Sequence, residues 1–411
     1  MSNEMKVIAG LDIGNGYVKG STQCLTDKPI SIDLPSCVAY VINPTGDVPT
    51  GADAITSEIA DIFNRMDLSF DTPLVHSTGR RLFGNRGIES GKSIESFNID
   101  SHRSKAEQDL SAVLTLGCIA GTALQDYWTV NQTLPVGVMQ VHAGVALALP
   151  IDEYKKHRET FARKFMANTH IVCFHNFEQP VRMEIIFDDV QVLAEGASAQ
   201  FAIISKGEPL MNLMLQDVRS HGIKLDGIEA KDILAAEGTV GIDIGEGTVN
   251  LPVFINGRFN TDASMTLQKG WGSVLSDSLE PLAVQQIPFN NRKALAVFLQ
   301  QKPNPLTASK RNAVMNVVQG ESQNLVRDIV AQFTRVMERS NGLIQVAYVY
   351  GGGATPMKEL LYDALLDAAK EFCGGGDFPI MYLDSQYSRY LNKEGLFQIA
   401  KQFANQVDNY R

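Results

Sequence analysis

Short apolar runs near the start of the chain alternate with polar positions, and glycine and proline separate the runs. The runs cover 7–13, 17–20 and 36–42. Such runs, bounded by turn residues, predict strands. Segment 181–192 also alternates, whereas 343–350 is almost continuously apolar, as in a strand that is covered on both faces. We therefore expect strands in both halves of the chain.

Other segments repeat apolar residues every three or four positions, which predicts helices. Segment 106–124 has the composition of a buried helix, and 154–166 is amphipathic and charged. The pattern is helical again from about 270 to 340, where 321–340 carries one apolar stripe and Asn341-Gly342 follows as a stop signal. Strands mixed with helices along the chain predict the α/β class.

One nine-residue phrase occurs twice, at Gly10–Val18 and at Gly241–Val249. In each copy an apolar strand leads to an aspartate, Asp12 or Asp243, and then to a tight glycine turn and a second apolar strand. Alternation along the strand places each carboxylate opposite its apolar neighbours, so that it projects at the end of the strand. A single copy is compatible with an ordinary hairpin, but two copies in matched contexts favour a functional pair.

The two turns have the composition of an anion-binding site. Glycine allows backbone N–H groups to approach an anion closely, which suits phosphate oxygens. Because two aspartates repel phosphate, a divalent cation is needed between them. Mg²⁺ with several retained waters is the natural bridge from such carboxylates to a polyphosphate.

A third glycine motif follows the apolar segment 343–350. Three consecutive glycines precede Ala354, and we expect Thr355 to be the N-cap and Pro356 the first residue of a following helix. A strand, a glycine turn and a capped helix are typical of a nucleotide site, where residues without side chains leave a flat floor for a purine or a ribose. A plain strand-to-helix connection is the alternative, but such a turn rarely needs three glycines.

Composition narrows the classes of partner and compartment. The 411 residues carry a formal net charge of -10, which disfavours direct binding to nucleic acid, so that contact with DNA would need an adaptor. Five cysteines without paired spacing indicate reduced thiols and a cytoplasmic protein, and no secretion signal or membrane-spanning run is expected. His170, Cys173 and His175 are close in sequence, but we interpret them as a buried strand because a fourth metal ligand is missing.

Taken together, these motifs resemble the actin-like ATPase superfamily, which includes actin, the heat-shock chaperone ATPases and sugar kinases. Residues 12–16 with Lys19 resemble its first phosphate motif, 243–248 its second and 351–354 its adenosine motif. The pattern Asp-x-Gly-Asn-Gly-x-x-Lys and the run 148–154 are most similar to the bacterial ParM/StbA plasmid-segregation actins. Segment 391–396 is similar to the C-terminal Asn-x-x-Gly segment of that group, whereas 43–100 and 275–340 carry no family motif.

The resemblance implies an actin-like fold with two similar halves, each a mixed sheet flanked by helices around a ribonuclease H-like core, and a nucleotide in the interdomain cleft. The first half would span 1–194, with a small inserted subdomain at about 43–100. The C-terminal segment, about 380–411, would pack back on this half. The second half would span 195–379, with a helical subdomain at about 270–341.

The resemblance also implies functional residues. Mg²⁺ would be held mostly through water by Asp12 and Asp243, and Glu195, in a connecting helix that begins within 193–199, would orient the attacking water. The implied catalytic residues are Glu195, Asp12 and Asp243. The implied nucleotide-binding residues are Gly14, Asn15, Gly16, Lys19, Gly245, Glu246, Gly247, Thr248, Gly351, Gly352, Gly353 and Ala354.

The expected activity is hydrolysis of ATP, or of GTP, coupled to assembly of the chain into filaments that segregate plasmid DNA. The expected partners are further copies of the chain and a DNA-binding adaptor of the ParR type, with no direct nucleic acid and no membrane. Two alternatives share the fold. A small-molecule kinase would need a catalytic aspartate base that we cannot identify, and a chaperone or reactivase ATPase would usually carry a further partner-binding domain. A polymerising scaffold in which nucleotide only stabilises the fold is a third, non-enzymatic alternative.

Overall fold

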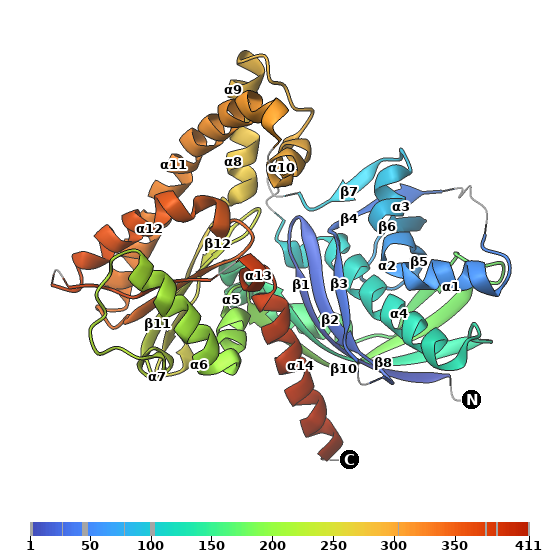
Figure 1. The fold of residues 1–411 in the computed structure, drawn as a ribbon. Helices are drawn as coiled ribbons and strands as arrows, with labels where there is room; N and C mark the ends of the chain where they lie inside the picture. The colour runs from blue at the N-terminus through green and yellow to red at the C-terminus, as the bar shows by residue number, and fades with distance from the viewer. Residues whose placement is uncertain are drawn as a thin grey trace. The chain divides into compact units, whose positions relative to one another are not determined.

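The computed structural model describes residues 3–26, 28–42, 48–77, 79–98, 103–302, 304–374, 376–383 and 385–409. The chain divides into two compact units (Figure 1). The first contains the described residues of 1–149, 153–194 and 392–411, and the second contains 150–152 and 195–391. Some of the expected boundaries fall on residues that are not described. The residues outside the description include 43–47, 78, 99–102, 384 and 410–411.

The first unit is built on a mixed sheet of ten strands in the order β3-β2-β1-β8-β10-β9-β5-β6-β4-β7. The neighbours of β8, which are β1 and β10, run parallel to it, and the other neighbouring strands of this sheet pair antiparallel. The strands are β1 (Glu4–Ile13), β2 (Tyr17–Gln23), β3 (Ile30–Pro35), β4 (Cys37–Val41), β5 (Asp67–Asp71), β6 (Arg80–Phe83), β7 (Ile94–Ser96), β8 (Val138–Leu149), β9 (His170–Phe174) and β10 (Val181–Ala194).

Helices cover both faces of the central strands of this sheet. On β8, Val145 and Leu147 belong to the core that contains α4, whereas Ala146 and Ala148 pack against Leu396 and its neighbours in α14. Alternate residues of a strand face opposite sides, so α4 and α14 lie on opposite faces. The helices of this region are α1 (Ala52–Ala60), α2 (Ile62–Arg65), α3 (Gly84–Glu89), the 3-10 turn η1 (Lys105–Glu107), α4 (Asp109–Asn131), α5 (Ile151–Met166) and α14 (Leu391–Asn409).

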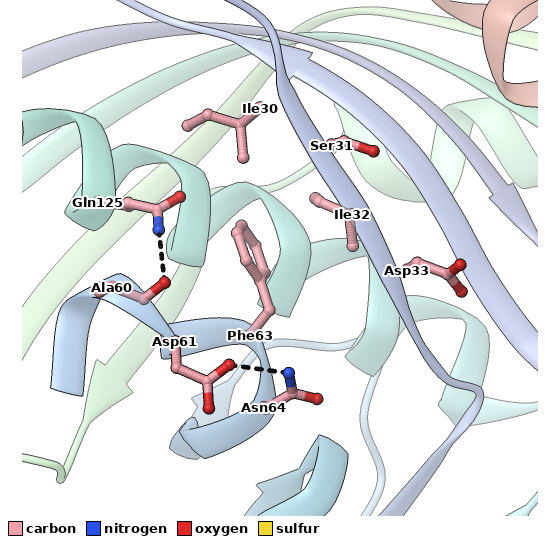
Figure 2. Close-up of a pocket in the computed structure, with 9 residues that line it drawn as sticks. All are labelled: Ile30, Ser31, Ile32, Asp33, Ala60, Asp61, Phe63, Asn64 and Gln125. Atoms are coloured by element: carbon pink, nitrogen blue, oxygen red, sulfur yellow. Dashed lines mark hydrogen bonds between the residues drawn. The ribbon is translucent and has the colours of Figure 1, made fainter. Parts of the chain in front are cut away.

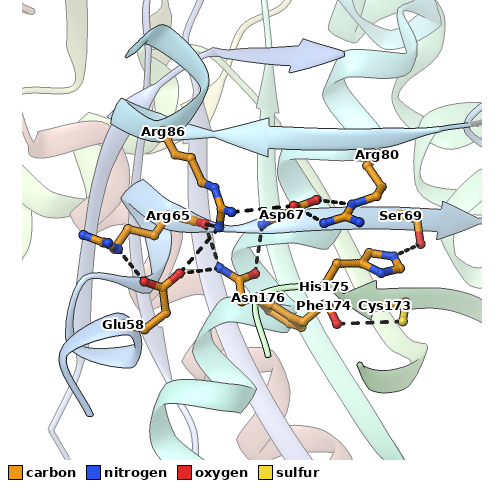
Figure 3. A network of polar contacts seen from close by, with 10 residues as sticks. All are labelled: Glu58, Arg65, Asp67, Ser69, Arg80, Arg86, Cys173, Phe174, His175 and Asn176. Atoms are coloured by element: carbon orange, nitrogen blue, oxygen red, sulfur yellow. Dashed lines mark hydrogen bonds and ion pairs between the residues drawn. The ribbon is translucent and has the colours of Figure 1, made fainter. Parts of the chain in front are cut away.

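The stretch expected to be an inserted subdomain at 43–100 contributes strands to the same sheet. Strand β5 pairs with β9, β6 pairs with β5, and β4 joins β6 to β7. Figure 3 shows the polar contacts that hold this stretch to the end of β9. The Asn176 side chain accepts from the Asp67 N–H group at 3.0 Å and donates to the Glu58 carboxylate at 2.7 Å, and Arg80 pairs with Asp67. Buried carboxylates are tolerated here because donors satisfy them.

The second unit has a seven-stranded sheet in which β14-β13-β11-β12-β15 are neighbours and β16 joins β11 to β17. Strand β16 runs parallel to β11, whereas β12 and β13 are antiparallel to it. The strands are β11 (Gly238–Ile244), β12 (Val249–Leu251), β13 (Val253–Ile255), β14 (Arg258–Phe259), β15 (Met265–Leu267), β16 (Val346–Tyr350) and β17 (Ile380–Tyr382). Strand β17 therefore belongs to the second unit, in contrast to the expectation that the whole C-terminal segment from about 380 packs on the first.

The helices of the second unit include the long α11, which buries Val326, Ile329, Phe333 and Met337 of the predicted stripe. It starts well before 321 and ends before Asn341, whose positive φ of 53° terminates it. The helices are α6 (Ala197–Ser220), α7 (Ala230–Leu234), α8 (Trp271–Asp277), α9 (Leu279–Val284), α10 (Arg292–Gln300), the 3-10 turn η2 (Pro305–Thr307), α11 (Ala308–Arg339), α12 (Ala354–Lys370) and α13 (Ser385–Ser388).

Each unit is thus a mixed sheet flanked by helices, which confirms the predicted α/β architecture. Most expected elements are present, with different ends: 106–124 lies in η1 and α4, 154–166 in α5, and 343–350 is a strand only from Val346. Strand β3 was not predicted, although Ile32 and Leu34 are its buried alternate positions. Within the described residues, no helix combines the length and apolar composition that crossing a bilayer requires.

Candidate functional site

The two copies of the repeated phrase fold into the same hairpin. In the first, Asp12 lies opposite Lys19 in the pairing of β1 with β2. In the second, Asp243 lies opposite Asn250 in the pairing of β11 with β12. The turns close alike, because the Gly14 N–H group donates to the Tyr17 carbonyl at 3.0 Å and the Gly245 N–H group donates to the Thr248 carbonyl at 2.9 Å. The repeat in sequence is therefore a repeat in backbone structure.

The first glycine of each turn is required by a close approach. A Cβ atom at Gly14 would lie 2.9 Å from the Tyr17 carbonyl oxygen, and one at Gly245 would lie 3.0 Å from the Thr248 carbonyl oxygen. Both distances are shorter than ordinary van der Waals contact. The prediction that these glycines serve a tight turn is consistent with the position of each at the closing hydrogen bond.

The peptide groups of the second turn are oriented by their surroundings. The Ile244 carbonyl accepts a hydrogen bond of 2.8 Å from the N–H group of Gly353. The Gly245 carbonyl accepts one of 2.9 Å from Trp271, and the Glu246 carbonyl accepts one of 2.8 Å from Gly272, both at the start of α8. In a planar trans peptide the N–H and C=O bonds point in opposite directions. The N–H groups of Glu246 and Gly247 therefore point away from α8, as in the backbone concavities that bind anions.

Three carboxylates of the predicted site are almost buried, with exposed fractions of 8% for Asp12, 6% for Asp243 and 9% for Glu195. Buried carboxylates normally pair with donors or metal ions. In the second unit, the Asn250 side-chain amide donates to Glu195 at 3.1 Å and to the Thr248 hydroxyl at 3.3 Å. The hydroxyl of Thr266 in turn donates to the Asn250 amide oxygen at 2.8 Å, which fixes the orientation of the amide.

Asn250 and Thr266 were not predicted. Asn250 occupies in the second hairpin the register position that Lys19 occupies in the first. Comparing the two copies beyond their shared glycines would have identified this position as one that faces the aspartate. Nothing in the sequence would have identified Thr266, because it reaches the site from the neighbouring strand β15.

Glu195 does not lie in a helix, so the expectation of a connecting helix that contains it is wrong. Strand β10 ends at Ala194 and α6 begins at Ala197. Between them Gly196 has a φ of 78°, a conformation that interrupts regular structure. The Gly196 carbonyl accepts a hydrogen bond of 2.7 Å from the hydroxyl of Tyr350, and a Cβ atom at Gly196 would lie 3.1 Å from the Cβ of Asp243. The turn thus holds Glu195 beside the second hairpin.

Tyr350 is fully buried at the end of β16. Burial raises the pKa of its hydroxyl well above the usual value, and the negative charge of Asp243 raises it further. The hydroxyl therefore remains protonated and can donate to Gly196. A Cβ atom at Gly241 would lie 2.1 Å from this hydroxyl oxygen, so the glycine that opens the second copy makes room for Tyr350.

The glycines of the third motif have different roles. Gly351 has a φ of 95°, and a Cβ atom there would lie 2.6 Å from the Asp243 carboxylate. A Cβ atom at Gly353 would lie 2.6 Å from the Ile244 side chain and 2.8 Å from Cβ of Trp271. These two glycines let the turn pack on β11 and α8, whereas Gly352 is exposed and borders open space. Only Gly352 therefore fits the expected open floor for a ligand.

The expected capping of the following helix is wrong. Helix α12 begins at Ala354 with Gly353 as its N-cap, and no side chain caps it. Thr355 and Pro356 are the second and third residues of the helix. The proline is tolerated because N–H groups of the first helical turn have no partner within the helix. The Gly353 N–H group bonds to the Ile244 carbonyl instead, which ties the start of α12 to the second hairpin.

The predicted site residues thus gather in two groups, one in each unit. The first unit brings together Asp12, Lys19 and the turn 14–16, and the Gly16 carbonyl accepts from the Ser36 N–H group at 2.9 Å. The second unit brings together a larger group, which consists of Glu195, Asp243, Gly245, Glu246, Gly247, Thr248, Gly351, Gly352, Gly353 and Ala354. The Glu246 side chain pairs with Arg292 at 3.2 Å. The group of Glu246 that is available to a ligand is therefore its backbone N–H group.

Two other features of the first unit, a pair of histidines and a pocket, are formed by residues outside the predicted site. His170 bonds to the Thr72 hydroxyl and to the Phe165 carbonyl, and His175 bonds to the Ser69 hydroxyl. Burial lowers the pKa of both histidines. A pocket of about 300 Å³ lies beside the edge strand β3, and none of the predicted site residues lines it (Figure 2). Its lining residues are Ile30, Ser31, Ile32, Asp33, Ala60, Asp61, Phe63, Asn64 and Gln125.

Comparisons with known proteins give the fold a family context. Residues 10–197 match the family described as actin like proteins, N terminal domain. The solved structure of the actin-like protein Alp7A aligns over 99% of both chains, with a TM-score of 0.64 and 16% identity. Bacillus thuringiensis ParM with ATP aligns over 99% of this chain and 100% of its own, with a TM-score of 0.55 and 15% identity.

An archaeal actin homologue, Ta0583, aligns over 96% of this chain and 99% of its own, with a TM-score of 0.57 and 13% identity. No curated protein matches the chain. At these identities the solved structures establish the fold, and the predicted resemblance to actin-like proteins close to ParM is confirmed. The chain therefore has the actin-like fold, and its residues 10–197 match the N-terminal domain of actin-like proteins.

Proposed function

We propose that the protein is an actin-like ATPase that assembles into nucleotide-dependent filaments. The observation that carries this proposal is the pair of hairpins, each of which combines a buried aspartate with a glycine turn of the same geometry. One such hairpin would be an ordinary turn. Two of them, one in each half of an actin-like fold, support binding of a polyphosphate.

Together, the two hairpins contribute three kinds of group to this function. The turns contribute backbone N–H groups, of which those of Glu246 and Gly247 point away from α8. Lys19 contributes a positive charge for phosphate oxygens. Asp12 and Asp243 would hold Mg²⁺ mostly through water, and their oxygen donors are the kind that this ion prefers. Bound Mg²⁺ supplies charge neutralisation for the phosphates.

Glu195 is the proposed general base. Its carboxylate is nearly buried and is held by the Asn250 amide at 3.1 Å, so that it can orient a water or accept a proton from it in a fixed position. Phosphoryl transfer depends mainly on positioning and on electrostatic stabilisation. The contacts around Glu195 in the second unit support the contribution from positioning.

The biological role that we propose is segregation of plasmid DNA in the cytoplasm through a DNA-binding adaptor of the ParR type. Among the structural neighbours are Bacillus thuringiensis ParM with ATP, with ADP and with AMPPNP, and a non-polymerisable quadruple mutant of pCBH ParM. The net charge of -10 supports an adaptor in place of direct contact with DNA. Because one fold serves several functions, this role requires its own test.

The decisive experiment measures phosphate release and nucleotide binding by the full chain with Mg²⁺. The wild type should hydrolyse ATP or GTP, and Asp243→Ala should lose Mg²⁺-dependent turnover. Glu195→Gln should bind nucleotide but release phosphate about a hundredfold more slowly, because the base is lost while its shape is kept. Full turnover by either variant would contradict the assigned roles, and no binding of any nucleotide by the wild type would contradict the proposal.

A further inference from the structure

Glu246 places a carboxylate in a turn whose backbone is oriented for an anion. The N–H groups of Glu246 and Gly247 point away from α8, and a phosphate that accepts from them would lie near the carboxylate of the same residue. The phosphate and the half-buried Glu246 carboxylate carry like charges and repel each other. The turn therefore needs a feature that directs this negative charge elsewhere.

The structure provides such a feature in Arg292, the first residue of α10. Its guanidinium lies 3.2 Å from the Glu246 carboxylate. The ion pair lies next to Gly272 in the first turn of α8. A Cβ atom at Gly272 would lie 2.8 Å from Cγ of Glu246 and 3.5 Å from the nearest guanidinium nitrogen of Arg292. The Gly272 N–H group also donates to the Glu246 carbonyl at 2.8 Å. Backbone and side chain of Glu246 are thus both held on the α8 side of the turn.

Helix α10 presents Arg292 from a fixed position. At its start, the Asn291 side chain caps the helix by accepting from the Ala294 N–H group at 2.9 Å. At its end, the Arg311 guanidinium from α11 donates to the carbonyls of Leu299 and Gln301 at 2.8 and 3.0 Å. The backbone of Arg292 is therefore held in place, and pairing with the carboxylate orders its side chain.

We propose that Arg292 is a positioning residue for nucleotide phosphate, because it neutralises Glu246 and holds its carboxylate away from the phosphate-binding N–H groups. The inference rests on the proposed function of the turn and adds a specific residue that no sequence motif indicated. It also links α10 to the phosphate site, because a residue of a helix distant in sequence balances the negative charge of the turn.

The test compares four variants of the full chain by calorimetric titration with two probes, ATP and inorganic tripolyphosphate, each with Mg²⁺. Arg292→Ala should weaken binding of both probes about tenfold, because an unpaired carboxylate then faces the phosphate. Glu246→Gln should bind at least as tightly as the wild type. The double variant with both changes should recover binding to within about twofold of the wild type, and Arg292→Lys should recover part of it.

Salt dependence separates this electrostatic role from a structural one. The loss in Arg292→Ala should shrink as ionic strength rises, because salt screens the repulsion. The matched control is Lys269→Ala, which removes another ion pair of the same region, with Asp328 at 2.8 Å, and should leave both affinities unchanged. Thermal unfolding of each variant checks that the fold is intact.

The outcomes distinguish the two proposals. If the wild type binds neither probe, the proposed function and this inference both fail. If the wild type binds but the double variant is as weak as Arg292→Ala, neutralisation of Glu246 is not the role of Arg292 and only the inference fails. A loss seen with ATP but not with tripolyphosphate would also overturn it, since the effect is assigned to the phosphates.

Discussion

Single residues in and beside the second hairpin form a chain of contacts around the proposed base. Thr266 orients the Asn250 amide, and Asn250 donates to Glu195. The hydroxyl of Tyr350 holds the carbonyl of Gly196, the residue next to Glu195. A carboxylate that is fixed at its side chain and at its neighbouring peptide has little freedom, which is what orientation of a water requires. Removal of one link should affect turnover more than binding.

Asn250→Ala is expected to lower the rate of phosphate release about tenfold while nucleotide affinity changes less than about threefold, because Glu195 stays present but is less well oriented. Single-turnover phosphate release and calorimetric titration measure the two effects. Asn324→Ala, at an exposed position of α11, serves as the control. Equal losses in rate and affinity would instead assign Asn250 to nucleotide binding.

At the scale of elements, packing decides which glycines of the repeat are indispensable. A Cβ atom at Gly10 in β1 would lie 2.2 Å from the backbone nitrogen of Phe397, so α14 rests directly on this strand. In the second copy the equivalent Gly241 is faced by a tyrosine side chain. The same sequence position therefore serves a helix in one unit and a hydroxyl in the other.

Gly10→Ala is expected to lower the free energy of unfolding by about 1–3 kcal/mol, because the clash is with helix backbone and cannot be relieved by a rotamer change. Gly144→Ala is the matched control, since a Cβ atom at this position of the neighbouring strand β8 meets nothing within 4 Å. That change should alter stability by less than about 0.5 kcal/mol. Chemical denaturation measures both, and equal effects would show that α14 does not restrict β1.

Buried tyrosines on the sheet and helices of the second unit predict a pH dependence. Burial raises the pKa of Tyr348, Tyr350 and Tyr382 above the usual value and raises the pKa of Tyr362 to about 12. A group whose folded-state pKa is raised contributes stability that is complete below its unfolded pKa, near 10, and is lost as the pH rises through the folded value.

The free energy of unfolding should therefore fall steadily above about pH 10, and tyrosinate absorbance should appear together with unfolding. Urea denaturation from about pH 8 to about pH 11 tests this. In Tyr362→Phe the slope of stability against pH should be smaller. Tyrosinate that forms fully while the protein remains folded would contradict the expectation.

At the scale of the whole molecule, the proposed function requires assembly that depends on nucleotide. We expect the full chain with ATP or GTP and Mg²⁺ to sediment above a critical concentration, and chelation of Mg²⁺ to abolish sedimentation. Glu195→Gln should form filaments that persist longer than those of the wild type, because hydrolysis is slowed after assembly. Pelleting with electron microscopy measures this, and a wild type that hydrolyses nucleotide without sedimenting would be a monomeric ATPase.

Local features of the chain could be predicted because they depend on neighbours in sequence. The hairpins at Asp12 and Asp243 follow from alternation and from glycine turns, and the stripe of α11 follows from helical periodicity. Segment 30–35 was missed although it alternates, because it is short and has proline at one end and next to the other. The helix around Glu195 and the cap at Thr355 were wrong, since Gly196 and Gly353 take conformations and hydrogen bonds that depend on β16 and β11.

The repeated hairpins, the glycine turn after β16 and the α/β class follow from the chain alone, because each depends on local spacing and on backbone conformation. The contacts of Asn250 with Glu195, of Tyr350 with Gly196 and of Arg292 with Glu246 are visible only in the folded molecule. These contacts join residues that lie 55, 154 and 46 positions apart in the sequence, respectively. Which residues meet in these contacts depends on how the sheet and its helices pack, and this packing does not produce a periodic pattern in the sequence.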